Sequence, residues 1–489
     1  MTHLSNKKIM SIVPVVLVIT SFLIAGASVS FAQPGPPHSN QPVMIYVSPT
    51  GSNITGNGST ATPYSTIQYA VQVAPPHAVI IVEPGTYNEM VNITKTLTVE
   101  SLSGIPGNTI INAMGQVFGI LVQGHSASGT IISGLTIENA GSHGVFIVDS
   151  SNVIIEYNVL THDGLNSTLT NIIPEDKAIE LVGTSNSTVV DNIVINDLGG
   201  GIGVSDNGPI NPGYIGSGMP SVAYDNVISG NSIINTIGGC GIVISSYNAG
   251  EGVIGNIVTN NKLVNDFSSI IVAADTPNTA AINNTVSYNT VLNTGEAGVV
   301  VHSNSPGDVV VNNAIIGNTI SADGDPFSVP NIPIYTGILI GGEGPVPVIN
   351  TTISSNMIDK ETYGVAVING IGTRVLSNNI FTTSVKIPVN NTAIVSTETV
   401  QNNARINSLN EVIASLSSQL SNLQSSVATS AQLNSLQSTV NSLKSSTVSN
   451  SQFNSLSGSL GTTTDVAYIS LVLAIVLGIV AIALALRKK

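Results

Sequence analysis

The tetrad "GIVI" at Gly241–Ile244 recurs along the middle of the chain, and this repetition decides the fold. Each copy begins with a small residue, and its second and fourth positions are branched or long apolar residues. The other copies are "GILV" (119–122), "GVFI" (144–147), "AIEL" (178–181), "GIGV" (201–204), "SIIV" (269–272), "GVVV" (298–301), "GILI" (337–340) and "GVAV" (364–367). Such alternation predicts short strands that bury one face.

A second pattern, an asparagine followed two positions later by an apolar residue, alternates with the tetrads. Its members are Asn158, Asn192, Asn231, Asn261, Asn289, Asn318, Asn356 and Asn378. The tightest spacings between successive tetrads are 23 to 29 residues. A unit of two or three short strands cannot bury its apolar face alone, so we expect the units to stack as coils about 4.8 Å apart. Nine such coils would give a rod about 40 Å long.

The repeated asparagine and glycine each suggest a role in these coils. An inward-facing turn asparagine can bond the same amide one coil further on, which predicts a ladder of side chains. The glycine before each strand is expected to let the backbone turn with a positive φ.

These coils resemble the right-handed parallel β-helix of the pectin-lyase-like superfamily. The lead-in "PYSTIQYAVQVAPPHAVIIVEPGTYNE", Pro63 to Glu89, is similar to the capping helix and first strand of such domains. The resemblance covers roughly residues 43–390 and concerns the fold rather than an activity. A β-sandwich of short strands is the alternative, but sandwich strands do not repeat their sequence. We therefore expect a mainly β chain: a parallel β-helix over 43–395, then an α-helical coiled coil and one C-terminal transmembrane helix.

The composition narrows the classes of function. Only 8% of the residues are charged, and 27 acidic residues face 13 basic ones. No basic patch for nucleic acid can form from so few cations, so we expect no nucleic-acid partner. Cys240 is the single cysteine, which excludes an intrachain disulfide. Between two glycines and before Ile242, it reads as a small buried residue, with a reactive thiol as the alternative.

No catalytic signature of the resembled superfamily is present, so we expect no enzyme. Lyases of that fold use an Arg or Lys beside acid-bound calcium. The four cations between Gly119 and Ile380 have no evident acidic cluster beside them: Lys177, Lys262, Lys360 and Arg374. "GSHG" (141–144) is the nearest to a glycosidase motif and does not match it. The chain also lacks the Trp that usually lines carbohydrate clefts.

Two carboxylates and three histidines are further candidates for catalytic or metal-binding residues. Asp149 and Asp206 each follow the start of their tetrad by five residues, two coils apart. They are read as solvated turn carboxylates or, alternatively, as an inverting glycosidase pair about 10 Å apart. Asp149 with neighbouring carbonyls is also a possible calcium site, although we expect no cofactor or metal. The histidines His143, His162 and His302 read as surface residues on turns.

The N-terminus predicts export. Lys7 and Lys8 precede an apolar core, and small residues at Ser30 and Ala32 mark a cleavage site, so residues 1–32 read as a signal peptide and 33–42 as a linker. An uncleaved anchor is the alternative. Eight candidate N-glycosylation sites, of which we expect only part to be used, agree with an extracellular location: Asn53, Asn57, Asn92, Asn166, Asn186, Asn283, Asn350 and Asn390.

Residues 396–464 predict a stalk. Apolar residues follow spacings of three and four, the seam of a coiled coil, at Ile406, Leu409, Ile413, Leu416, Leu420, Leu423 and Val427, and after a phase break at Leu433, Leu436, Val440 and Leu443. A continuous helix from 406 to 460 would be about 80 Å long. The seam favours a parallel homodimer. A single helix packed back on the β-helix is the alternative.

The chain ends in a predicted membrane anchor. Residues 466–486 are long and apolar enough to span a bilayer, and Arg487, Lys488 and Lys489 mark the cytoplasmic side. This places the N-terminal bulk outside the cell in a single-pass arrangement with membrane lipid as one partner.

The order of segments resembles the small membrane-anchoring stalk subunit of the two-component S-layers of Sulfolobales-type archaea. That resemblance implies a trimeric homo-oligomer and a larger S-layer lattice protein as partner. It predicts a structural protein that tethers a surface lattice to the cytoplasmic membrane. The alternatives are a membrane-anchored adhesin or glycan-binding β-helix, and a stalked polysaccharide lyase or hydrolase.

Overall fold

The computed structural model describes residues 41–165, 176–207, 221–236, 238–266, 268–295, 297–321, 335–342 and 344–391, together with the single residue 418. The predicted signal peptide, coiled coil and membrane span lie outside these residues. Within the described part, no helix has the length and apolar character needed to cross a membrane.

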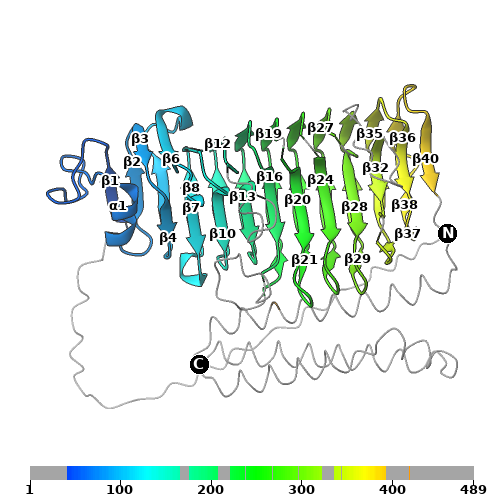
Figure 1. Ribbon diagram of the computed structural model, residues 1–489, viewed down its shortest axis with the longest axis horizontal. Coiled ribbons are helices and arrows are strands. Elements are labelled where there is room, and N and C mark those ends of the chain that lie inside the picture. The colour runs from blue at the N-terminus through cyan, green and yellow to red at the C-terminus, as the bar shows by residue number, and fades with distance from the viewer. Residues whose placement is uncertain are drawn as a thin grey trace, which may run out of the picture. The chain divides into compact units, whose positions relative to one another are not determined.

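The described chain is a stack of coils whose strands form four parallel sheets (Figure 1). Sheet 1 has twelve strands: β1 Met44–Val47, β2 Val79–Val82, β5 Thr98–Ser101, β8 Ile131–Ser133, β11 Ile154–Glu156, β14 Thr188–Val190, β18 Val227–Ser229, β22 Ile257–Thr259, β26 Thr285–Ser287, β30 Ala314–Ile316, β34 Thr352–Ser354 and β38 Arg374–Val375.

Sheet 2 contains the longest strands, and there are eleven of them: β4 Val91–Ile93, β7 Phe118–Gln123, β10 His143–Val148, β13 Lys177–Val182, β16 Gly200–Ser205, β20 Cys240–Ser246, β24 Ser268–Ala274, β28 Val299–Ser303, β32 Thr336–Ile340, β36 Tyr363–Val367 and β40 Ile387–Asn391.

Sheets 3 and 4 complete the coils. Sheet 3 has eleven strands: β3 Gly85–Asn88, β6 Thr109–Asn112, β9 Thr136–Glu138, β12 Val159–Thr161, β15 Ile193–Ile195, β19 Ser232–Ile234, β23 Lys262–Val264, β27 Thr290–Leu292, β31 Thr319–Ser321, β35 Met357–Asp359 and β39 Ile380–Phe381. Sheet 4 has six: β17 Ala223–Tyr224, β21 Gly252–Ile254, β25 Ala280–Ile282, β29 Val309–Val311, β33 Val348–Ile349 and β37 Gly370–Ile371. Two 3₁₀ turns occur at Pro106–Asn108 and His125–Ala127.

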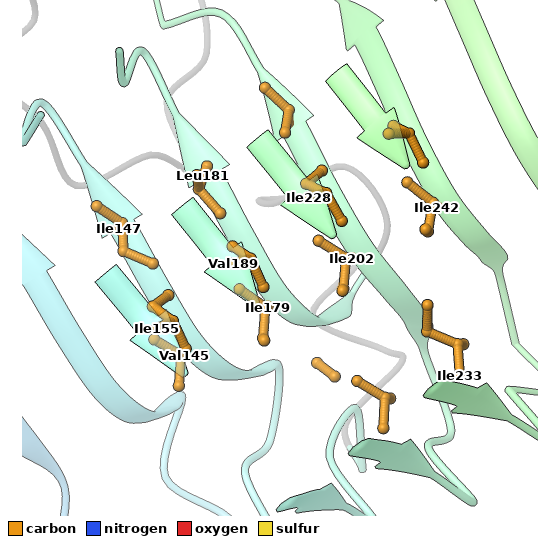
Figure 2. Close-up of a cluster of buried hydrophobic side chains, with 14 of the residues drawn as sticks. Val145, Ile147, Ile155, Ile179, Leu181, Val189, Ile202, Ile228, Ile233 and Ile242 are labelled. Atoms are coloured by element: carbon orange, nitrogen blue, oxygen red, sulfur yellow. The ribbon is translucent and has the colours of Figure 1, made fainter. Parts of the chain in front are cut away.

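Each strand pairs with the strand of the next coil, as the register Ile202↔Ile242 and Val204↔Ile244 shows. The predicted parallel β-helix is therefore confirmed, and the stack exceeds the nine coils that the tetrads alone predict. The connections between parallel strands of one sheet are right-handed in nearly all proteins. The second and fourth residues of the tetrads point inward and form one continuous core with sheets 1 and 3 (Figure 2).

A short helix covers the N-terminal end of the stack. Helix α1, Ile67–Val73, buries Ile67, Ala70 and Val71. Its first N–H groups, on Ile67 and Gln68, donate to the Glu89 carboxylate at 2.9 and 2.8 Å. The predicted capping helix is confirmed, although β1 precedes it and pairs with β2, so the lead-in strand is not the first.

The predicted asparagine ladder is present and buried. Asn261 Nδ2 donates to Asn289 Oδ1 at 3.0 Å, and the same bond links every successive member from Asn158 onward. The last member is Asn379, not Asn378, because Asn356 donates to Asn379 Oδ1. A second buried ladder, which the sequence analysis missed, consists of Asn226, Asn256, Asn284 and Asn313.

The prediction of positive φ at the tetrad glycines is wrong. None of these glycines is among the residues with positive φ. They are small because the corner is crowded: a Cβ on Gly298 would lie 2.3 Å from Ile320 Cγ2 and 2.9 Å from the Gly337 carbonyl. The positive φ falls instead on the residue before each ladder asparagine from Asn158 to Asn356, such as Asn260 at 56°.

Candidate functional site on the outer face of sheet 2

Each of the three longest connections after the N-terminal cap begins or ends at a strand of sheet 2. They run from β12 to β13, from β16 to β17 and from β31 to β32. Insertions in a solenoid collect on one face, and that face is often the binding face. This directs attention to the outer face of sheet 2, and above all to β13 and β16, which two of these connections adjoin.

Two ionisable side chains of β13 lie across two glycines of β16. The register places Lys177 beside Gly200 and Glu180 beside Gly203. A Cβ on Gly203 would lie 1.7 Å from Glu180 Oε2, and one on Gly200 would lie 2.6 Å from Lys177 Cδ. Glycine weakens a strand interior and often marks a close approach of other groups. Here it makes room for the Lys177 and Glu180 side chains, which are 2% and 5% exposed.

Glu180 stands where other coils carry apolar residues. Its neighbour on β10 is Phe146, and the same outward column continues beyond Gly203 with Val243 and Ile271. Glu180 Oε1 accepts a hydrogen bond from Ser205 Oγ at 2.9 Å. Buried ion-forming side chains cost stability compared with apolar ones, so their presence in an otherwise apolar column is typical of a functional position.

His143 extends this group to β10, and the prediction that it is a surface histidine is wrong. The side chain is fully buried. The Lys177 N–H donates to His143 Nδ1 at 3.0 Å, while Nε2 has no hydrogen-bond partner. The ring stands 4.9 Å from that of Phe146. Burial is the main cause that lowers the pKa of His143 to about 3, so the imidazole is neutral at ordinary pH.

Carboxyl groups surround the backbone of Lys177, contrary to the expectation that its surroundings lack acids. Ser142 Oγ donates to Asp176 at 2.5 Å. Burial raises the pKa of Asp197 to about 7, with the nearby Asp176 charge adding to the rise. Burial and then the charge of Asp197 raise the pKa of Asp163 well above its usual range, and Asp163 Oδ2 has no partner.

This arrangement places Lys177 near the Asp176 and Asp197 carboxyl groups, whose pKa values its charge lowers against the effect of burial. Glu180 lies three residues further along the same strand. Side chains of these kinds can bind a polar ligand and exchange protons with it. Cys240 follows Gly200 in the strand register and is half-buried rather than buried as predicted. Within the described residues, no three His, Cys, Asp or Glu side chains are placed to hold a metal.

Asp149 and Asp206, the carboxylate pair considered from the sequence, are both buried, so the prediction that they are solvated turn carboxylates is wrong. Asn207 Nδ2 donates to Asp149 Oδ1 at 2.6 Å. Asp206 accepts from Ser246 Oγ at 2.6 Å and from the Tyr247 N–H at 2.8 Å. Burial raises the pKa of Asp206 to about 6. Their hydrogen bonds connect coils, which is a structural role.

The remaining candidates are dispersed. His162 is exposed and lies 2.8 Å from Thr161 Oγ1, and His302 on β28 lies 2.9 Å from Asn304 Oδ1. Lys262 and Arg374 are exposed on β23 and β38, and Lys360 is exposed after β35. None of these side chains joins the Lys177 group.

The candidate glycosylation sites divide into three kinds. Asn186, Asn283 and Asn350 occupy equivalent turns with φ of 53–57°, each directly before a buried turn residue and a strand, so the repeat itself generates their sequence pattern. Asn53 and Asn57 bond their own loop, and Asn92 Oδ1 accepts from Gln123. Asn390 lies half-buried on β40, and Asn166 lies outside the described residues.

A family model and several solved structures match parts of this chain. A model of the family described as "Protein of unknown function (DUF1565)" matches residues 50–280. No curated protein matches the chain.

Solved structures with similar coils share little sequence with this chain. An alginate lyase from Paenibacillus sp. str. FPU-7 is 16% identical with a TM-score of 0.42, covering 66% of this chain and 96% of that one. The mannuronan C-5 epimerase AlgE6 A-module of Azotobacter vinelandii is 14% identical with a TM-score of 0.43, covering 66% and 96%. The Streptococcus pneumoniae surface protein and adhesin PfbA is 13% identical with a TM-score of 0.44, covering 66% and 93%.

Proposed function

We propose that this protein is a structural cell-surface protein, in which the β-helix is the rigid outward unit of a tether between the membrane and a surface-layer lattice. The observation that carries the proposal is the unbroken asparagine ladder from Asn158 to Asn379, which ties each coil to the next. Every rung is an uncharged hydrogen bond inside the stack. Such a ladder resists bending, and its own bonds are insensitive to salt and pH, as a spacer under tension requires.

The scarcity of charge supports the same role. Hydroxyl and amide side chains keep their hydration when carboxylates are protonated, and the buried carboxyl groups with raised pKa values favour acidic surroundings. The predicted C-terminal span would hold the β-helix to lipid, and the predicted coiled coil would join several copies.

The test is deletion of residues 466–489 in the producing cells. The tether proposal expects the surface coat to detach and the shortened protein to appear in the medium together with an abundant coat protein. Detergent extraction of unmodified cells should co-purify the same coat protein. An intact coat on the deletion strain would contradict the proposal.

A second function, binding or processing of surface polysaccharide, is favoured by the Lys177, Glu180 and His143 group. Cys240 is the single thiol of the chain, so its rate of alkylation reports on ligands bound beside Gly200. Glycan released from the producing cells should slow this alkylation and, if the site is catalytic, be shortened by the protein. Lys177→Met should abolish both effects and Lys262→Met, on an exposed side chain of β23, should abolish neither. Unchanged alkylation with every glycan fraction would remove this alternative.

A further inference from the structure

The two ends of the β-helix differ in how they are covered. At the N-terminal end, helix α1 buries its apolar side chains against the stack. At the other end, the last strands β39 and β40 leave Ile380, Ile387 and Val389 exposed by 59%, 40% and 42%. The outer edges of such strands present N–H and C=O groups that can pair with another strand, and proteins usually cover them.

The last member of the asparagine ladder lacks the acceptor that earlier members have. Asn356 donates from both its N–H and its Nδ2 to Asn379 Oδ1, at 3.0 Å each. Asn379 Nδ2 donates to the Ile353 carbonyl at 3.0 Å and, in place of a next asparagine, to the Leu376 carbonyl at 2.6 Å. A following coil would supply that next asparagine.

The sequence after β40 repeats the last coil in register. Val367 pairs with Asn391, so equivalent positions of these two coils are 24 residues apart. The same interval continues beyond Asn391. It relates Ile371 to Val395, Thr373 to Thr397, Arg374 to Glu398, Asn378 to Asn402 and Asn379 to Asn403.

We propose that residues 394–403 of this same chain cover the open end as one further partial coil. Ile394–Val395 add to β37, Glu398–Thr399 add to β38, and Asn403 becomes the next member of the buried ladder. Val395 extends an apolar column that already contains Ile349 and Ile371.

Charge supports this occupant over a second copy or a separate protein. Arg374 is exposed on β38, and the register sets Glu398 directly beside it on the added strand. Opposite charges that face each other across strands stabilise the pairing. The added coil ends at Asn403 because Arg405 falls at the position of Phe381, whose ring packs on the core. Two substitutions are weak: Thr399 takes the place of Val375, and Ser396 takes the place of Gly372, whose φ is 66°.

A functional consequence follows for the connection to the stalk. Ile406, the first residue of the predicted coiled-coil seam, comes three positions after Asn403. On this proposal only Ala404 and Arg405 separate the added coil from the predicted seam.

A disulfide trap tests the register. In the full-length chain carrying Cys240→Ser, the pair Thr373→Cys with Thr397→Cys should lose both thiols on mild oxidation and stay monomeric on a denaturing gel. The control pair Thr373→Cys with Ser396→Cys, shifted by one residue to the other face of the strand, should keep its thiols. Equal oxidation of the two pairs would overturn the proposal. A disulfide-linked dimer would overturn it too, by showing that a second copy occupies the end.

A charge exchange provides an independent measurement if the cysteine variants fold poorly. Arg374→Glu and Glu398→Arg should each lower the melting temperature, and the double variant should recover most of the loss. If the two losses add instead, Glu398 does not lie beside Arg374 and the proposal fails.

Discussion

Each coil has two turns whose side chains point inward and connect neighbouring coils, and the two turns carry different kinds of side chain. The turn between sheets 1 and 3 carries the asparagine ladder, and the turn between sheets 3 and 2 carries the carboxyl column Asp163, Asp197 and Asp266. An amide both donates and accepts, so Asn261 Nδ2 donates to Asn289 Oδ1 while Asn261 Oδ1 accepts from Asn231. An ionised carboxylate only accepts.

The carboxyl column consequently has unsatisfied atoms. Asp266 Oδ1 accepts from the Thr236 N–H at 3.0 Å and from Thr236 Oγ1 at 2.9 Å. Its other oxygen, like that of Asp163, is buried without a partner. Burial raises the pKa of Asp266 to about 7. The two turns play the same part in the coil. The asparagine turn is independent of pH, whereas the carboxyl turn binds protons near neutral pH.

The largest expected loss of stability comes from placing a carboxyl group in the asparagine ladder. Asn261→Asp removes the donor to the Ile228 carbonyl and to Asn289 and places a charge among buried amides. We expect a loss of about 4 kcal/mol in the free energy of unfolding at pH 7, measured by urea denaturation. The control is Asn260→Asp, one residue earlier, where the side chain is exposed and φ is 56°. Equal losses in the two variants would show that the ladder is not what stabilises the coils.

The next effect is the pH dependence of the carboxyl corner. The folded-state pKa of Asp266 is above the unfolded value, so the proton is bound more tightly in the folded protein. Its stabilising contribution is fully present below about pH 4 and is lost as the pH rises towards 7. From the pKa difference the loss is about 3 kcal/mol for this group.

Thermal unfolding across pH 4 to 7 measures this effect. The melting temperature of the unmodified protein should fall as the pH rises, and Asp266→Asn should reduce this slope and raise the melting temperature at pH 7. Asp191→Asn, at an exposed turn, is the matched control and should leave the slope unchanged. A melting temperature that rises from pH 4 to 7 would contradict the assignment.

Much of the fold was predictable because the repeated sequence pattern indicates which residues face the core of each coil. The tetrads identify core positions such as Ile202 and Val204, and the asparagine spacing identifies the ladder. The last rung was misplaced by one residue because Asn378 and Asn379 are adjacent and only the turn decides which points inward. The glycine prediction failed because crowding by the next coil is a long-range effect that the tetrad does not reveal.

The candidate site was not predicted, although one signal existed. The third position of the tetrads is apolar or small in every copy except "AIEL", where it is Glu180. The following copy, "GIGV", has glycine at that position, and together they indicate a side chain lying over a gap. The burial of His143 could not be read from the sequence, because its hydrogen-bond partner Lys177 comes 34 residues later.

A smaller loss of stability is expected from Gly203→Ala, which tests whether the Glu180 side chain requires a glycine at position 203. Gly203→Ala puts a methyl group on the Glu180 carboxylate, and we expect a loss of about 2 kcal/mol in the free energy of unfolding. In Gly203→Ala with Glu180→Ala the loss relative to Glu180→Ala alone should nearly vanish. Chemical denaturation of the four proteins of this cycle gives the coupling. Additive losses would mean that other groups, and not Glu180, require the glycine.

The smallest effect concerns a third row of asparagines, which makes the same amide bonds in water. Asn265 Nδ2 donates to Asn235 Oδ1 at 3.2 Å, and both residues have φ of 59° and lie on the surface. Asn265→Gly removes the bond but keeps the backbone conformation, so the free energy of unfolding should change by less than about 0.5 kcal/mol. Asn265→Ala should cost about 1 kcal/mol, because a Cβ without the local polar bonds is strained at positive φ. Urea denaturation of both variants separates the two causes. A loss for Asn265→Gly as large as for Asn261→Asp would show that the amide bond itself, and not its burial, stabilises the stack.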